Sequence, residues 1–403
     1  MSVDRKYLSF ADLCKSAKRR LPHFCYEYLM GGVGPEVGLK RNRVALDEVQ
    51  LVPHQWTDVN ESNCKSEIFG KTYEYPFGVA PVGMSGLIWP KSARMLARAA
   101  KMFNVPFTLS TTSTCKLDDV RAEGGENTWF QMYVPKDEEI TRRFVKQLTA
   151  AAYSVLLVTV DLPIYAFRER DIRNGLSLPP SFGARSLFEI ISNPSWALRS
   201  AAVGVPQFVN VLALAPNGLS ASERNNFVDE FGEGRVTLQK LKLLRDLWPG
   251  SLVVKGILTP DDASQCKAMG VDGVVVSNHG ARQMDAAPAP IEVLPQIRAA
   301  VGEAYPLLVD GGCRSGLDVA RMIASGADFV LMGRAPYAGV AAMGERGALH
   351  TFQIIADEFQ QTLCLTGCEN PKDLRKVLWE RSDDKRPVKP VLIEGFQRAV
   401  GGT

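Results

Sequence analysis

The pattern best suited to acid–base chemistry is Ser277-Asn-His-Gly-Ala-Arg282, where a histidine and an arginine follow an apolar run directly. A histidine titrates near neutrality and can act as a general base, and an arginine can hold a carboxylate through two parallel bonds. Asp161, at the end of another apolar run, is a candidate to orient or support His279, and Arg168 is a second candidate for the carboxylate. The alternatives are a structural histidine, a loop cap for Asp161 and surface ion pairs for the arginines.

A second group of residues indicates an anionic ligand. Lys255 lies inside an otherwise apolar run, and a buried lysine needs an anionic partner. It could instead form a Schiff base, as in an aldolase-like enzyme. Glycines follow two later runs, together with Arg314 and Arg334, and their backbone N–H groups could approach a phosphate closely. The alternative is that these glycines are only turn residues.

These residues all lie at the ends of short apolar runs, and the runs predict the fold. Each run is almost continuously apolar, as expected for a parallel strand covered on both faces. Most neighbouring runs start 22 to 33 residues apart, which leaves room for one helix between them. Eight such units predict a (β/α)8 TIM barrel rather than a doubly wound open sheet, and barrel chemistry occurs at the carboxyl ends of the strands. The expected strands are Phe77–Gly83, Phe107–Ser110, Trp129–Val134, Val155–Asp161, Ser251–Ile257, Gly273–Asn278, Pro306–Gly312 and Phe329–Arg334.

The segments around this repeat give the expected domain limits. Residues 1–380 are expected to form a single barrel domain, and residues 381–403, which begin charged and proline-bearing, a tail. Residues 1–60 are expected to hold two short helices and a linker, the first helix covering Phe10–Arg20 with Ser9 as its N-cap.

The gap between the fourth and fifth runs is too long for one helix, so residues 176–235 are expected to be an insertion. It contains the longest uncharged stretch of the chain, Ser200–Ser222. Pro206 and Pro216 argue against a membrane-spanning helix there. The stretch is expected to be a buried or ordered loop, or else a segment that lies on a membrane surface.

Composition excludes several classes of protein. Apolar residues make up 46% of the chain and charged residues 23%, which excludes a disordered chain. With 47 basic and 44 acidic residues, nucleic acid is not an expected partner. Four histidines and eight scattered cysteines, none in a CxxC motif, predict no metal site and no disulfide framework. The N-terminus has no apolar core of a secretory signal, so a cytoplasmic protein is expected.

With its flanking residues, the histidine motif resembles the active-site signature of the FMN-dependent α-hydroxy acid oxidases and dehydrogenases. The resemblance covers about residues 8–375 in order, and within the family it is greatest to the bacterial (S)-mandelate and L-lactate dehydrogenases. The matching motifs are Tyr28-Leu-Met-Gly-Gly, Ala80-Pro81, Leu109-Ser110, Gln131-Met-Tyr133, Thr159-Val-Asp161, Arg168-Glu-Arg-Asp171, Val254-Lys-Gly256, Ser277 to Asp285, Asp310-Gly-Gly312 and Gly333-Arg334.

The resemblance implies a role for each matching residue. His279 would remove a proton from an (S)-2-hydroxy acid, at the α-carbon or at the hydroxyl, and Asp161 would stabilise the imidazolium. Arg168 and Arg282 would hold the substrate carboxylate, and Lys255 would stabilise reduced flavin. Tyr28 and Tyr133 would bond to the carboxylate or hydroxyl. The remaining residues would bind FMN: Pro81, Val82, Gly83, Ser110, Gln131, Thr159 and Ser277 around the ring, Asp310 on the ribityl chain, and Gly312, Arg314, Gly333 and Arg334 on the phosphate.

The resemblance leaves the electron acceptor open. Gly83 stands where many family oxidases carry alanine, so both a quinone or other carrier and O₂ are acceptors to consider. Membrane-associated members carry an insertion at the place of residues 176–220, which predicts peripheral binding to the cytoplasmic face of the inner membrane; a lid over the active site is the alternative. The family also implies a homotetramer. A non-catalytic flavin-binding barrel is a further alternative, but the base and both arginines are present.

Overall fold

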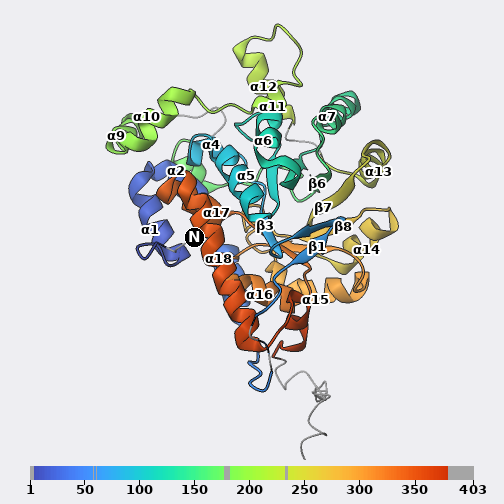
Figure 1. The fold of residues 1–403 in the computed structure, drawn as a ribbon. Coiled ribbons are helices and arrows are strands. Elements are labelled where there is room, and N and C mark those ends of the chain that lie inside the picture. Colours follow the sequence, from blue (N-terminus) through green and yellow to red (C-terminus); the bar gives the residue numbers. More distant parts are fainter. Residues whose placement is uncertain (1–3, 58, 60, 177–181, 232–234, 380–403) are drawn as a thin grey trace, which may run out of the picture.

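A computed structural model describes residues 4–57, 59, 61–176, 182–231 and 235–379. Eight parallel strands close into a barrel in the order β3 to β10, and β10 pairs with β3 through Val330 and Phe77 (Figure 1). The predicted (β/α)8 barrel is therefore confirmed. Its strands are β3 (Phe77–Val79), β4 (Phe107–Ser110), β5 (Thr128–Met132), β6 (Val155–Thr159), β7 (Ser251–Ile257), β8 (Gly273–Val276), β9 (Leu307–Asp310) and β10 (Phe329–Met332).

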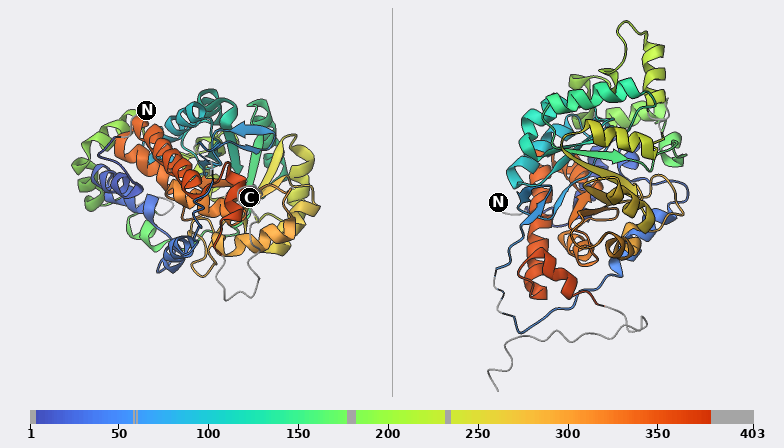
Figure 2. Two further views of the ribbon diagram at one scale, coloured as in Figure 1. Left: turned by 60° about the horizontal axis from the view of Figure 1, so that its bottom comes forward. Right: turned by 90° about the vertical axis from the view of Figure 1, so that its right-hand side faces the viewer.

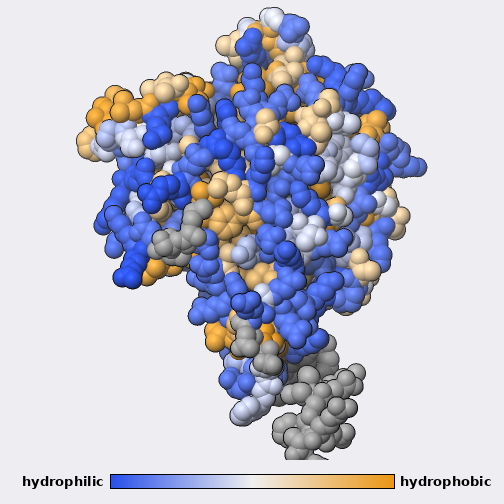
Figure 3. Space-filling view, viewed as in Figure 1, coloured by the Kyte–Doolittle hydropathy of each residue, from blue (hydrophilic) through white to orange (hydrophobic). Residues whose placement is uncertain are grey.

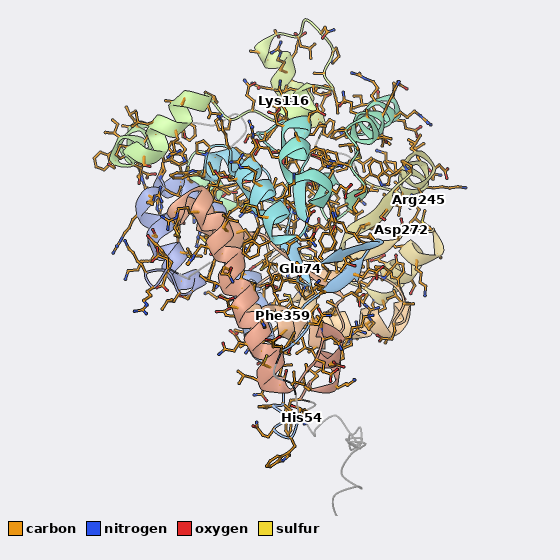
Figure 4. The ribbon with its side chains drawn as sticks, viewed as in Figure 1. His54, Glu74, Lys116, Arg245, Asp272 and Phe359 are labelled. Carbon is orange, nitrogen blue, oxygen red and sulfur yellow. The ribbon has the colours of Figure 1, made fainter. Side chains whose placement is uncertain are left out.

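Helices surround the barrel and cover the outer face of the strands. Each turns one apolar face inward; Leu96, Ala97 and Ala100 of α5, for example, are buried. The long helix α18, on which Figure 4 labels Phe359, packs closely on α16. The contact is so close that a Cβ atom on Gly316 of α16 would clash with the backbone of Phe359. The covering helices are α5 (Ser92–Phe103), α6 (Leu117–Gly124), α7 (Glu138–Ala150), α13 (Leu238–Leu247), α14 (Pro260–Ala268), α15 (Pro290–Val301), α16 (Gly316–Ala324), α17 (Arg334–Met343) and α18 (Glu345–Thr366).

The inside of the barrel is a packed core. Trp129 and Phe329 belong to a cluster of fully buried residues from alternate positions of the strands. A hairpin that the sequence did not predict, β1 (Ser66–Ile68) and β2 (Lys71–Tyr73), contributes Tyr73, whose hydroxyl accepts a hydrogen bond from Trp129 Nε1 at 3.1 Å. The amino end of the barrel is therefore filled, and chemistry is restricted to the carboxyl end.

The N-terminal segment holds three helices rather than the two that were predicted. The first is α1 (Phe10–Arg20), and Ser9 caps it as expected, by accepting a hydrogen bond from the Asp12 N–H. The second is α2 (His23–Met30), and the third, absent from the prediction, is α3 (Val37–Asp47). The sequence of α3, rich in basic residues, shows little amphipathic pattern, which is why it was missed.

The insertion after β6 is helical and lies outside the barrel. The short helix α8 (Glu169–Arg173) precedes it, and the insertion itself contains α9 (Ala184–Ser192), α10 (Pro194–Val203), α11 (Val209–Leu212) and α12 (Ala221–Phe231). Figures 1 and 2 show α9 and α10 beside α1 and α2, and Phe24 contacts Trp196 edge to face at 5.9 Å. The uncharged stretch therefore contains the end of α10, all of α11, the first residues of α12 and the loops between these helices. In the described part of the chain, none of the helices combines the length and apolarity needed to cross a bilayer. Residues 177–181, 232–234 and 381–403 of the expected insertion and tail lie outside the described residues.

Candidate active site

A cavity of about 590 Å³ lies at the carboxyl ends of the strands and brings most of the predicted site residues together. Three predicted residues do not line the cavity but form hydrogen bonds to residues that do: Ser110 to Gln131, Ser277 to Lys255, and Asp161 to His279. The predicted residues that line the cavity are Tyr28, Pro81, Val82, Gly83, Gln131, Tyr133, Thr159, Arg168, Lys255, His279, Arg282, Asp310, Gly312, Arg314, Gly333 and Arg334.

His279 and Asp161 form the pair that the sequence suggested. His279 Nδ1 lies 2.9 Å from Asp161 Oδ1, so Nδ1 is the donor and Nε2 is left to accept a proton. Burial lowers the pKa of His279, and Asp161 opposes this effect only in part. Burial acts to raise the pKa of Asp161, but the charge and hydrogen bond of His279, together with the charge of Lys255, outweigh it and the pKa is lowered. The histidine is therefore neutral, and the carboxylate ionised, at neutral pH.

Gly256 makes room for this pair, a requirement that the sequence did not reveal. Its φ is +109°, and a Cβ atom there would lie 2.6 Å from the Cβ of Asp161. A side chain at this position would displace the carboxylate from His279. Gly256 follows Lys255 in β7, so strand β7 supplies both a cation and the space for Asp161.

The two arginines lie side by side. Arg168 Nε donates to the carbonyl oxygen of Arg282 at 3.1 Å. Arg282 donates to the carbonyl oxygens of Tyr28 and Gly31, stacks over the Tyr28 ring and pairs with Asp171 at 3.2 Å. Burial, and then the charge of Arg168, lower the pKa of Arg282. Two guanidinium groups therefore lie close together in the cavity wall. Such a site can accept a carboxylate.

Lys255 has the anionic partner that its burial demands. Its Nζ donates to Ser277 Oγ at 2.9 Å and lies 3.1 Å from Asp310 Oδ2. Burial acts to lower the pKa of Lys255, but Asp310 and Asp161 outweigh it, so the pKa is raised. The amine is therefore protonated and is not the free nucleophile that a Schiff-base enzyme needs.

The loops after β9 and β10 form the part of the cavity suited to a phosphate. Gly312 has a φ of +87°, and a Cβ there would lie 2.8 Å from the carbonyl oxygen of Asn42. Arg334 is partly buried, and burial, with the charges of Arg282 and Arg314, lowers its pKa to about 9. Because the arginines repel one another, an anion in this place would stabilise them.

Several polar atoms at the cavity have no partner among the described residues. They are the side-chain atoms Gln131 Nε2, Asp310 Oδ1 and Arg334 Nε, all buried. An unpaired buried polar atom is costly, and such atoms usually indicate a ligand or ordered water. Among the described residues, these atoms offer a ligand two donors, on Gln131 and Arg334, and one acceptor, on Asp310.

Other lining residues were missed because they come from segments without a strand pattern. Asp171 of α8 pairs with Arg282, and Phe208 and Asp229 come from the insertion. The Arg168-Glu-Arg-Asp171 motif gave a signal for Asp171. Nothing in the sequence placed Phe208 or Asp229 at the barrel mouth, because their approach depends on how the insertion folds back.

Comparisons with known proteins agree with this geometry. A family profile described as FMN-dependent dehydrogenase matches residues 17–381. The chain is 36% identical to (S)-mandelate dehydrogenase of Pseudomonas putida over 366 residues, 91% of this chain and 92% of that protein. It is 37% identical to an L-lactate dehydrogenase of Caulobacter vibrioides over 373 residues, 92% of this chain and 97% of that protein. A crystal structure of monotopic membrane protein (S)-mandelate dehydrogenase aligns with a TM-score of 0.88 and 34% identity, and covers 94% of this chain and all of the other.

Proposed function

This chain belongs to the FMN-dependent dehydrogenase family, and on that premise we propose that it oxidises an (S)-2-hydroxy acid to the 2-oxo acid. The observation that carries the proposal is the neutral His279, paired with Asp161 at 2.9 Å, in the same cavity as Arg168 and Arg282. A base and a carboxylate site within one cavity are what such an acid requires.

The residues of the cavity fit FMN. Arg314, Arg334 and the glycine loops would hold its phosphate, Asp310 its ribityl chain, and Gln131 the polar edge of its ring. Pro81, Val82, Gly83 and Thr159 line the same cavity, and Ser110 and Ser277 support it from behind. Lys255 would place a positive charge beside the ring. FMN, when bound, accepts the two electrons that leave the substrate.

The protein residues prepare the substrate for this oxidation. Arg168 and Arg282 would bind the carboxylate, with the hydroxyl groups of Tyr28 and Tyr133 bonding to the carboxylate or the substrate hydroxyl. His279 Nε2 would take the proton from the α-carbon or the hydroxyl. Asp161, with its lowered pKa, would stabilise the imidazolium that results.

The cavity also favours an apolar substituent on the substrate. Besides the charged groups, Val82, Leu162, Ile172, Leu176 and Phe208 line it. Apolar lining of this kind binds an aryl or alkyl group without an unpaired polar atom. We therefore propose a mandelate-like or lactate-like acid as the substrate.

The outer face of the insertion supports binding to a membrane, where a quinone could accept the electrons. Leu187, Phe188 and Ile191 of α9 are 59%, 71% and 67% exposed, and hydrophobic residues gather over α9 and α10 (Figure 3). An exposed apolar helical face fits the interfacial region of a bilayer. Peripheral membrane binding and transfer of electrons to a quinone or other carrier are therefore proposed, with O₂ as the alternative acceptor.

The assembly and the limits of the domain are proposed on the family resemblance. We propose a homotetramer on the cytoplasmic face of the inner membrane. Residues 1–380 would form the single FMN-binding domain, with residues 176–235 as its insertion.

Anaerobic spectroscopy tests the proposed reaction. Adding (S)-mandelate, L-lactate and glycolate in turn to the purified protein is expected to bleach the flavin band with one of the first two. Admission of air afterwards separates a slow dehydrogenase from a fast oxidase. A protein that binds FMN but is bleached by no 2-hydroxy acid would contradict the proposed substrate class.

A further inference from the structure

The loop that carries His279 has a backbone that needs external support. His279, Gly280 and Ala281 have φ values of 58°, 63° and 59°, three consecutive residues in the left-handed region. Two of them carry side chains, for which this conformation is unfavourable. Strain of this kind persists only where the surrounding structure holds it.

Asn278 and Asn42 provide that support from inside the protein. Asn42 Nδ2 donates to Asn278 Oδ1 at 3.0 Å, and Asn278 Nδ2 donates to Asn42 Oδ1 at 2.7 Å. Asn278 Oδ1 also accepts a hydrogen bond from the Ala281 N–H, and its Nδ2 donates to the Pro288 carbonyl. Both amides are buried, so this reciprocal pair ties the strained turn to α3.

The same residue of α3 also contacts the loop after β9. The carbonyl oxygen of Asn42 packs against Gly312, where a Cβ would approach it to 2.8 Å. The next residue, Arg43, donates to the Gly312 carbonyl at 2.7 Å and pairs with Asp318 of α16. One turn of α3 therefore contacts the loop of His279 on one side and the glycine loop of the cavity on the other.

The start of α3 is fixed to the His279 loop as well. Asp285 accepts hydrogen bonds from the N–H groups of Val37 and Gly38, at 3.1 and 2.7 Å, and so caps the helix from a distant part of the chain. Arg41 donates to the carbonyls of Asp285 and Ala287. These hydrogen bonds hold α3 at its first residues and again at Arg41, next to Asn42. The position of the helix therefore sets the position of Asn42.

We propose that Asn42 is a positioning residue, which holds the His279 loop in its strained conformation and in register with the glycine loop after β9. Asn42 does not line the cavity, so it acts only through Asn278 and Gly312. This assignment rests on the proposed function for the role of His279, but the contacts themselves do not depend on any substrate.

Hydrogen exchange tests the assignment without turnover. In FMN-loaded protein, Asn42→Ala is expected to speed amide exchange in residues 278–282 by about 10-fold or more, because the loop loses two buried hydrogen bonds. Val44→Ala is the matched control, since Val44 lies on the same helix and is 58% exposed. It is expected to leave exchange in this loop unchanged.

A pH profile separates positioning from general destabilisation. Asn42→Ala is expected to lower the rate of flavin reduction by about 10- to 100-fold and to move the pH at which this rate is half-maximal. Asn42→Asp is isosteric and keeps the acceptor for Asn278 Nδ2, but it sets a second acceptor against Asn278 Oδ1. It is therefore expected to speed exchange in residues 278–282 as well, and it serves if the alanine variant does not fold. The assignment is overturned if a folded variant retains wild-type exchange in residues 278–282, or if its pH profile is unchanged. A wild-type protein that no 2-hydroxy acid reduces would instead contradict the proposed function and leave the exchange result to decide on Asn42.

Discussion

The loop after β8 and the helices α9 and α10 both lie outside the regular barrel, but they are built in opposite ways. In the loop, His279 and Asn278 are held by hydrogen bonds to Asp161 and Asn42. On α9, the outward-facing apolar side chains are more than half exposed in the described part of the structure. The opposite face of the helix is held in place, because Glu189 accepts a hydrogen bond from the Phe24 N–H. Buried hydrogen bonds hold the catalytic side chains in one geometry, which a reaction requires. An exposed apolar face can only bind the protein to a surface such as a membrane. The two regions should therefore respond to different changes.

The largest expected effect is the loss of the base. His279→Asn is expected to slow flavin reduction by roughly 10²–10⁴-fold, because the variant lacks the imidazole that is proposed to take the proton. FMN content and binding to vesicles should stay as in wild type. Stopped-flow spectroscopy under anaerobic conditions measures this rate, and a variant with bound FMN and normal reduction would remove His279 from its proposed role.

Replacing a glycine by alanine, once beside the active site and once next to α9, gives the next comparison. Gly256→Ala is expected to displace Asp161 and to cost about 1–3 kcal/mol in the free energy of unfolding, because the new Cβ would overlap the carboxyl side chain. Gly183, next to α9, has open space around it, so Gly183→Ala is the matched control. Thermal unfolding and flavin reduction should both change for Gly256→Ala and neither for Gly183→Ala. Equal behaviour of the two variants would contradict the role given to Gly256.

The response to pH also differs between the two regions. Because burial holds the pKa of His279 below its ordinary value of 6.5, the neutral base is present at pH 7. The ratio kcat/KM should be flat at neutral pH and fall about tenfold per pH unit once the pH drops below the pKa of His279. Vesicle binding through Leu187, Phe188 and Ile191 should not change over this range, because none of them titrates. A kcat/KM limb with its midpoint above pH 6.5 would show that another group controls the reaction.

The smallest expected effect on the chemistry comes from the outer face of α9. Replacing Leu187, Phe188 and Ile191 by serine should weaken binding to vesicles of phosphatidylethanolamine and phosphatidylglycerol by about 100-fold or more, since each buried apolar side chain contributes about 1.5–3 kcal/mol. Leu365→Ser on α18, where Leu365 is 63% exposed, is the control and should leave vesicle binding unchanged. Unaltered sedimentation of the triple variant with vesicles would refute membrane binding through α9.

The sequence predicted those features that follow from local pattern. The eight strands could be recognised because a strand covered on both faces is apolar along its whole length, as Val155–Thr159 is. Asp161 and His279 could be related because each directly follows such a strand, and strand ends meet at one edge of a barrel. The order of the strands predicted that the two residues would be neighbours, and the structure places His279 Nδ1 2.9 Å from Asp161 Oδ1.

The features that were missed depend on contacts between distant segments. Asn42 lies between two arginines, a sequence typical of a solvated helix face, yet its amide is buried against Asn278. Gly256 looks like a residue that weakens a strand, and only the position of Asp161 explains it. Such residues carry no periodic signal, because their environment is set by where another part of the chain folds back.

The central claim is that the cavity carries out the reaction and that the outer face of α9 only binds the membrane. The most direct test is the rate of flavin reduction in the variant with Leu187, Phe188 and Ile191 replaced by serine, measured with the 2-hydroxy acid that bleaches the wild-type flavin. The rate constant should lie within about twofold of wild type, since surface substitutions away from a site usually change free energies by less than about 0.5 kcal/mol. A loss of tenfold or more, in a variant that retains FMN, would show that the outer face of the insertion takes part in the reaction, and would contradict the account.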